Sequence, residues 1–168
     1  TGDVFKMLNN PDLPFGPVTD EDGDEVTLTH GNYITFMESQ DRNVRKAAFT
    51  NMYEAYKKLI NTIAVNYNYN TKTDVVSARI RKYGSSLEAA LDGGNIPVSV
   101  YHNLISEVRE YLPVVHRYIE LRKKELGVDQ LKMYDVYVPL VNAPKKVIPF
   151  EQAIDIMAEG LAPLGEEY

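Results

Sequence analysis

The sequence contains no cysteine and no tryptophan, and only three of its 168 residues are histidine. Without cysteine the chain can form no disulfide, thiolate zinc site, iron–sulfur centre or cysteine nucleophile. No apolar run approaches the roughly 20 residues that cross a bilayer. The first residues, Thr-Gly-Asp-Val, lack the basic and apolar regions of a signal peptide. We therefore expect a soluble protein from a reducing compartment, with little material for a metal site.

Acidic residues outnumber basic ones, 24 to 18, which gives a net charge of -6 and a pI near 5.1. This balance argues against nucleic acid as a general partner. With 44% apolar and 25% charged residues, the composition is typical of a globular chain. The charge is uneven: residues 1–40 sum to -7, residues 41–126 to +5 and residues 127–168 to -4. The basic middle block also carries the clearest helical patterns.

The first segment predicts an extended hairpin, in which residues 15–18 and 26–28 flank an acidic turn. Asp22-Gly23 tolerates the positive φ angles of such a turn. A calcium loop is the alternative, but with Gly23 in its sixth position Val18 and Thr29 would be its first and twelfth residues. Neither supplies the carboxylate that calcium requires there. The prediction is a solvated turn.

Two helices are predicted next, a short one capped by Thr29 and a much longer one capped within residues 39–41. Asparagines and tyrosines at residues 66–70 are expected to weaken the longer helix, which could resume at residues 74–82. Its apolar stripe consists of Val44, Ala48, Met52, Ala55, Leu59 and Ile63. The basic residues mostly off this stripe are interpreted as a solvated face: Arg42, Arg45, Lys46, Lys57 and Lys58.

Two further helices follow. Ser85 and Glu88 form a capping-box pattern, and Gly93-Gly94 ends that short helix. Pro97 suits the first turn of the second, which should kink near Glu110 to Leu112 because of Pro113 and end at Gly127. The apolar stripe of this helix is Tyr101, Leu104, Ile105, Val108, Leu112, Val115, Ile119 and Leu126.

The last segment changes character. Residues 133–138 are β-prone and could pair with residues 145–148, and a final helix is expected over about 150–164. The predicted fold is therefore mainly α, with long antiparallel helices, an N-terminal hairpin and a small β element near residues 133–149.

No complete active site is found in the sequence. His30, His102 and His116 lie outside any His-Glu-x-x-His motif. His116 and Glu120 are spaced to share a helix face, and a structural hydrogen-bonded pair is the preferred interpretation. Neither a serine nucleophile elbow nor a phosphate-binding glycine loop is present. We predict no catalytic and no metal-ligating residue, and leave substrate-binding residues unassigned.

The order of these segments nevertheless resembles oligoendopeptidase F, a cytoplasmic zinc metallopeptidase related to the thimet oligopeptidases. The likeness spans essentially the whole chain. It is carried by residues 12–16, 28–33, 36–39, 42–49, 53–56, 86–91, 95–98, 112–118, 121–127 and 133–141.

The resemblance implies that this chain is a fragment of a longer protein. Family members are several hundred residues long, and their His-Glu-x-x-His helix and further Glu ligand lie beyond the position matching Tyr168. It implies residues 1–28 as an extended hairpin and linker, 29–127 as a helical N-terminal region and 128–168 as the start of a truncated catalytic domain. The parent would hydrolyse oligopeptides with zinc. This segment would bind no metal, would pack against the remainder of the catalytic domain, and would supply scaffold and channel wall without activity of its own.

The residues alone leave a second possibility open, a non-enzymatic helical interaction module. A His-Glu-x-x-His motif downstream of Tyr168 in the gene would support the peptidase, and a stop codon there would support the module.

Overall fold

The structure, a computed structural model, describes residues 2–141 and 148–165 and is mainly α-helical, as predicted. Its short elements are strands β1 (Pro17–Thr19) and β2 (Glu25–Thr27) and the 3-10 helices η1 (Met133–Asp135) and η2 (Ala162–Leu164). The α-helices are α1 (Gly2–Asn9), α2 (Tyr33–Met37), α3 (Arg42–Lys58), α4 (Ile60–Ile80), α5 (Ser86–Asp92), α6 (Val98–Glu125) and α7 (Phe150–Leu161).

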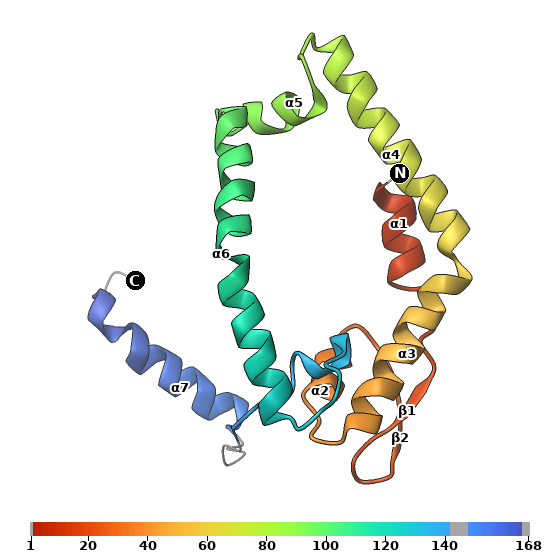
Figure 1. Cartoon of the computed structure of the whole chain (residues 1–168), viewed down its shortest axis with the longest axis vertical. Coiled ribbons are helices and arrows are strands. Elements are labelled where there is room, and N and C mark those ends of the chain that lie inside the picture. The colour runs from red at the N-terminus through yellow and green to blue at the C-terminus, as the bar shows by residue number, and fades with distance from the viewer. Residues whose placement is uncertain (1, 142–147, 166–168) are drawn as a thin grey trace.

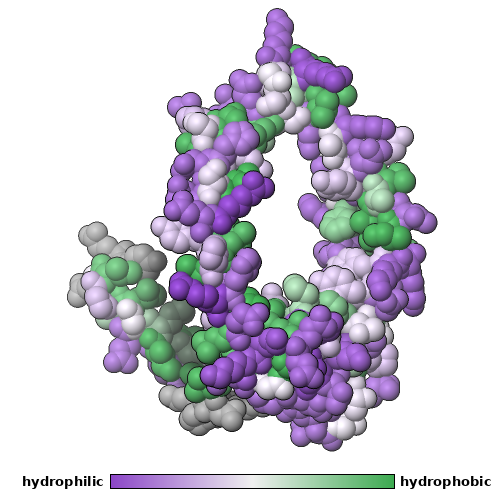
Figure 2. All heavy atoms as spheres, in the orientation of Figure 1, coloured by the Kyte–Doolittle hydropathy of each residue, from purple (hydrophilic) through white to green (hydrophobic). Residues whose placement is uncertain are grey.

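The helices form an open frame (Figure 1). Helices α3 and α4 follow one another along one side, the first arm, and α6 runs back in the opposite direction as the second arm. Residues 81–97, which include α5, join the arms at the upper corner. Residues 126–138, which include η1, lie between α6 and α3 at the lower corner. The opening between the arms remains when all heavy atoms are drawn as spheres (Figure 2).

The N-terminal hairpin is confirmed. β1 and β2 pair in antiparallel register, with Val18 opposite Val26. Gly23 has a φ of 90°, which a residue with a Cβ rarely adopts. Asp20 Oδ1 accepts hydrogen bonds from the backbone N–H groups of Asp22 (3.0 Å) and Asp24 (2.9 Å), so this carboxylate stabilises the turn itself.

The hydrophobic core lies at the lower end of the first arm, where the hairpin, α2 and α3 meet. Its side chains are fully or nearly fully buried because the hairpin covers the apolar stripe of α3. The buried residues are Leu13, Phe15, Val18, Leu28, Phe36, Met37, Val44, Ala48, Met52 and Ala55. Thus the first four positions of the predicted α3 stripe are confirmed as core.

The long helix breaks at a different place from the predicted one. Asp41 caps α3 as expected, accepting a hydrogen bond from the Asn43 backbone N–H at 2.8 Å. The break, however, falls at Leu59, and residues 66–70 are helical within α4. Thr71 and Thr73 donate side-chain hydrogen bonds to the carbonyls four residues earlier, at 3.2 and 2.9 Å. These hydroxyls are satisfied within the helix and do not interrupt it.

The predicted caps of α5 and the bounds of α6 are confirmed. The Ser85 side chain accepts from the Glu88 backbone N–H at 3.0 Å, and Glu88 Oε2 accepts from the Gly84 backbone N–H at 2.8 Å. α6 begins after Pro97, continues through Pro113 and stops before Gly127, whose φ is 62°.

Two further features of the chain differ from the sequence prediction. Residues 2–9 form a helix, α1, that contacts α4 and was not expected. The predicted β element near residues 133–149 is wrong for its described part, since residues 133–135 form a 3-10 turn and no strand occurs in 133–141 or 148–149. The Asp135 carboxylate accepts from the Lys132 backbone N–H at 3.0 Å, which closes this turn. Residues 142–147, which include most of the predicted partner strand, lie outside the described part.

Apolar side chains of α6 and α7 remain exposed instead of forming a core. Leu104 is 62% exposed, Val108 54% and Val115 50%, and on α7 Met157 is 59% exposed. Green atoms lie along both helices in Figure 2. Little in the described part of the chain covers the predicted stripe of α6.

Candidate functional site

The three histidines do not form a site. His30 Nε2 lies 2.9 Å from the Tyr56 hydroxyl, and its ring packs edge-on against Phe15. His102 and His116 are exposed on α6, and no hydrogen bond between His116 and Glu120 exists among the described residues. Within residues 2–141 and 148–165, no three histidine, aspartate or glutamate side chains come close enough together to hold a metal ion.

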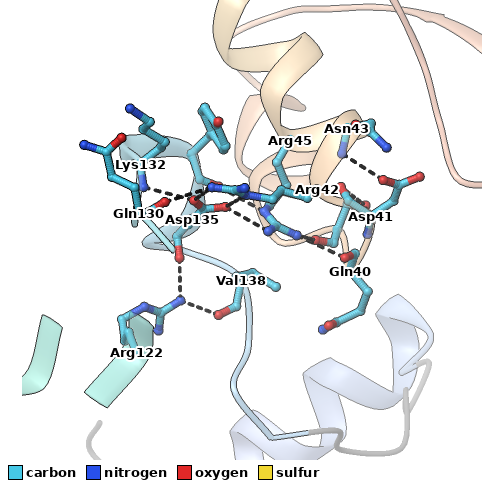
Figure 3. Close-up of polar contacts among 12 residues, drawn as sticks. Gln40, Asp41, Arg42, Asn43, Arg45, Arg122, Gln130, Lys132, Asp135 and Val138 are labelled. Atoms are coloured by element: carbon cyan, nitrogen blue, oxygen red, sulfur yellow. Dashed lines mark hydrogen bonds and ion pairs between the residues drawn. The ribbon is translucent and has the colours of Figure 1, made fainter. Parts of the chain in front are cut away.

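The most organised polar cluster lies at the lower corner, around Asp135 (Figure 3). Asp135 is 0% exposed and ends the 3-10 turn η1. A carboxylate is this fully buried only when other groups compensate its charge. The compensating groups come from α3, from α6 and from the turn itself.

The first arm provides two guanidinium groups. Arg42 and Arg45 are one helical turn apart at the start of α3, so both side chains reach the same carboxylate. Arg42 donates through Nε to Asp135 Oδ1 (3.1 Å) and through Nη2 to Oδ2 (2.8 Å), a bidentate pair. Arg45, which is 3% exposed, donates through Nη2 to Oδ1 at 2.9 Å.

These arginines also bind backbone carbonyls on both sides of the corner. Arg42 Nη2 donates to the Gln130 carbonyl at 3.0 Å, and Arg45 Nε donates to the Tyr134 carbonyl at 3.1 Å. Arg45 Nη1 donates to the carbonyls of Ser39 (2.8 Å) and Gln40 (3.1 Å), just before α3 begins. The cluster therefore joins the start of α3 to the loop that follows α6.

The second arm contributes Arg122, which is 5% exposed. Its Nη2 donates to the carbonyls of Asp135 (2.9 Å) and Val138 (2.5 Å), and its Nη1 donates to the Tyr118 hydroxyl (3.1 Å). Within residues 2–141 and 148–165, its buried Nε has no hydrogen-bond partner. Arg122 is thus a buried cation whose hydrogen-bond acceptors are all neutral.

The electrostatics keep Asp135 ionised. Burial alone would raise the pKa of its carboxyl group, but hydrogen bonds from Arg42 and Arg45 and from the Lys132 backbone N–H favour the charged form more strongly. The net effect lowers the pKa of Asp135 to about 2. A carboxylate with this pKa is a poor general base at neutral pH, so the cluster is suited to holding segments together and not to proton transfer.

The interpretation of Arg42 and Arg45 as a solvated face was wrong. Arg45 is buried among the inward positions of α3, and Arg42 pairs with a carboxylate 93 residues away. Their placement in the first turn of α3, where the helix dipole favours anions, is the local signal that could have marked both arginines as paired. Nothing in the local sequence identifies Asp135 as the partner, because the pairing depends on the path of the chain through α4, α5 and α6.

Comparisons with known proteins give the chain a family. The model of Peptidase family M3 matches residues 35–161, which includes α3 to α7. Oligopeptidase PepF of Bacillus subtilis is 46% identical over 168 residues, all of this chain and 25% of that protein. Group B oligopeptidase PepB of Streptococcus agalactiae is 43% identical over 167 residues, 99% of this chain and 28% of that protein.

A solved structure agrees with these relatives. The crystal structure of oligoendopeptidase-F from Enterococcus faecium matches with a TM-score of 0.81 and 42% identity, covering 99% of this chain and 31% of that one. This chain belongs to peptidase family M3 and corresponds to a segment of an oligoendopeptidase F. It spans about a quarter of the length of the curated relatives named above.

Proposed function

We propose that this chain is the helical scaffold of a zinc metalloendopeptidase that hydrolyses oligopeptides. In this proposal the two arms form part of the wall of a substrate channel, and the segment is inactive alone. The observation that supports it most directly is the exposed apolar face of α6, with Leu104, Val108 and Val115 half-exposed or more. A stripe with helical period is a core-facing pattern, so its exposure is what a segment separated from its packing partner would have.

The length of the relatives supports the same proposal. The chain covers 25% of Oligopeptidase PepF, so most of such a protein lies outside residues 1–168. We propose that this remainder, the rest of the catalytic domain, covers α6 and α7. Family membership favours this over a freestanding interaction module, which would need some other partner for the same surface.

The domain boundaries are part of the proposal. Residues 1–28 would be an extended N-terminal segment, 29–127 a helical region and 128–168 the start of the catalytic domain. The cluster around Asp135 supports a junction near residue 128, because there the loop after α6 is bound to both arms.

Zinc and its catalytic chemistry are assigned to the part of the parent enzyme outside this segment. The described residues do not fit a zinc site, since no three suitable side chains converge among them. No helix in the described part of the chain combines the length and apolar character of a membrane span. We propose a cytoplasmic parent that acts on oligopeptides and on neither nucleic acid nor membranes.

A peptidase assay tests the proposal. The longer gene product that contains residues 1–168 is expected to cleave an internally quenched fluorescent oligopeptide, and a chelator should abolish the cleavage. The 168-residue chain at equal concentration should give only the background rate. Chelator-sensitive cleavage by the 168-residue chain would overturn the assignment of this segment as scaffold, and a longer product without activity would overturn the enzymatic parent.

A further inference from the structure

Asp135 is held by the two arms through different atoms. Its carboxylate accepts from Arg42 and Arg45 of α3, whereas its backbone carbonyl accepts from Arg122 of α6. No hydrogen bond or ion pair joins α3 directly to α6 among residues 2–141 and 148–165. The polar connection between the arms at the lower corner therefore passes through this one residue and the adjoining loop.

The upper corner is built differently. The described residues of α5 and its flanks form no ion pair, and the corner relies on capping bonds and on an exposed hydrogen bond from the Tyr83 hydroxyl to Asp92 Oδ2 at 2.6 Å. Lys82 and Asn95, on either side of α5, have positive φ angles of 64° and 50°. Connections of this kind open at lower free energy than buried clusters do.

We infer that the Asp135 cluster is a latch that fixes the separation of the two arms, and that its release lets α3 and α6 move apart about the upper corner. This inference concerns the geometry of the frame and does not depend on peptidase activity. The competing explanation is that apolar packing holds the lower corner. Tyr134 packs on the core beside Phe49, with ring centroids 5.8 Å apart, and would remain after the carboxylate is removed.

Distance measurement between spin labels separates the two explanations. The chain has no cysteine, so Lys58→Cys at the end of α3 and Arg117→Cys on α6 give two unique labelling positions on exposed residues. In this background Asp135→Asn keeps the size of the side chain and removes its charge. Asp92→Asn is the matched control, because it makes the same chemical change at the exposed upper corner.

Double electron–electron resonance should give one narrow distance distribution for the doubly labelled chain without further substitution and for the same chain with Asp92→Asn. Asp135→Asn is expected to add a longer-distance population of about 10% or more, since a minor state that was hidden becomes populated. Far-UV circular dichroism should stay unchanged, because the arms remain helical. An unchanged distribution in a fully helical Asp135→Asn protein would overturn the latch and show that packing of Tyr134 holds the corner.

If Asp135→Asn loses helicity, a milder substitution on α6 tests the latch instead. Arg122→Lys keeps the charge on α6 but cannot bridge the carbonyls of Asp135 and Val138 as the guanidinium does. A longer-distance population in Arg122→Lys would support the latch, and an unchanged distribution would overturn it. If both variants unfold, the cluster is required for folding and the latch is likewise overturned.

Discussion

Both corners of the frame join one arm to the other, but the lower corner uses buried ion pairs and the upper corner uses exposed hydrogen bonds. At the lower corner a carboxylate with no exposure is paired with two arginines, while a third arginine binds the backbone beside it. At the upper corner α5 is held by capping hydrogen bonds of Ser85 and Glu88 and by the exposed hydrogen bond between Tyr83 and Asp92. Buried charge is costly when unpaired, so the lower corner should tolerate little change, whereas the upper one should tolerate much.

The largest difference is expected from removing the charge at each corner. Asp135→Asn leaves Arg45 buried without a counter-ion and should lower the free energy of unfolding by about 3 kcal/mol. Asp92→Asn should change it by less than about 0.5 kcal/mol, as for other exposed positions. Urea unfolding followed by circular dichroism measures both. Equal effects at the two positions would remove the proposed distinction between the corners.

Acid should weaken the lower corner selectively. The folded pKa of Asp135, about 2, lies below its reference value of 3.8, so its ionisation stabilises the folded state above pH 3.8. That contribution, about 2 kcal/mol, is lost as the pH falls from 3.8 through 2. The stability gap between the original chain and Asp135→Asn should therefore narrow between pH 6 and pH 2.5. A gap that stays constant in urea titrations would show that the charge of Asp135 is not what stabilises the corner.

A smaller effect is expected on the α6 side of the lower corner. Arg122→Lys should lower the free energy of unfolding by about 1 kcal/mol, because the hydrogen bonds to two carbonyls cannot all be kept. Lys123→Arg, the next residue along α6, serves as a control of similar size and equal charge. Thermal unfolding of the two variants provides the comparison, and a more stable Arg122→Lys protein would contradict the role given to the guanidinium.

The smallest effect concerns the upper corner. Ser85→Ala removes the cap of α5, worth about 1 kcal/mol locally, and should leave the global unfolding transition nearly unchanged. Trypsin cleavage after the exposed Lys82 should become about fivefold faster. A loss of about 1 kcal/mol raises the population of locally opened α5 by about this factor, and cleavage follows that population when opening and closing are fast. Ser86→Ala, one position further on, is the matched control. No acceleration would mean that α5 opens only with the rest of the chain.

Local sequence signals predicted most of the helices. Asp41, Ser85 and Pro97 mark the starts of α3, α5 and α6, because caps act within one turn. The hairpin was predicted from Asp22-Gly23, because the conformation of a tight turn also depends on adjacent residues. The break at Leu59 was missed because residues 66–70 offered a stronger local signal of disruption than Leu59 did.

The lower corner could not be predicted, because its contacts are long-range. Asp135 lies in a β-prone stretch, and only arginines 90 and 93 positions away explain why it is buried in a turn. The helix α6 was predicted from its apolar period, but periodicity does not say which chain segment covers the stripe. The likeness to oligoendopeptidase F came from residues throughout the chain and was confirmed by the match to peptidase family M3.

Native-state hydrogen exchange tests the comparison of the corners most directly, since it reports the opening of each in the same unaltered chain. Amides of residues 45–55 and the hydrogen-bonded amide of Asp135 are expected to exchange only with global unfolding, whereas the amides of residues 88–96 exchange through smaller local openings. Protection at the α5 corner equal to that around Asp135 would contradict the account.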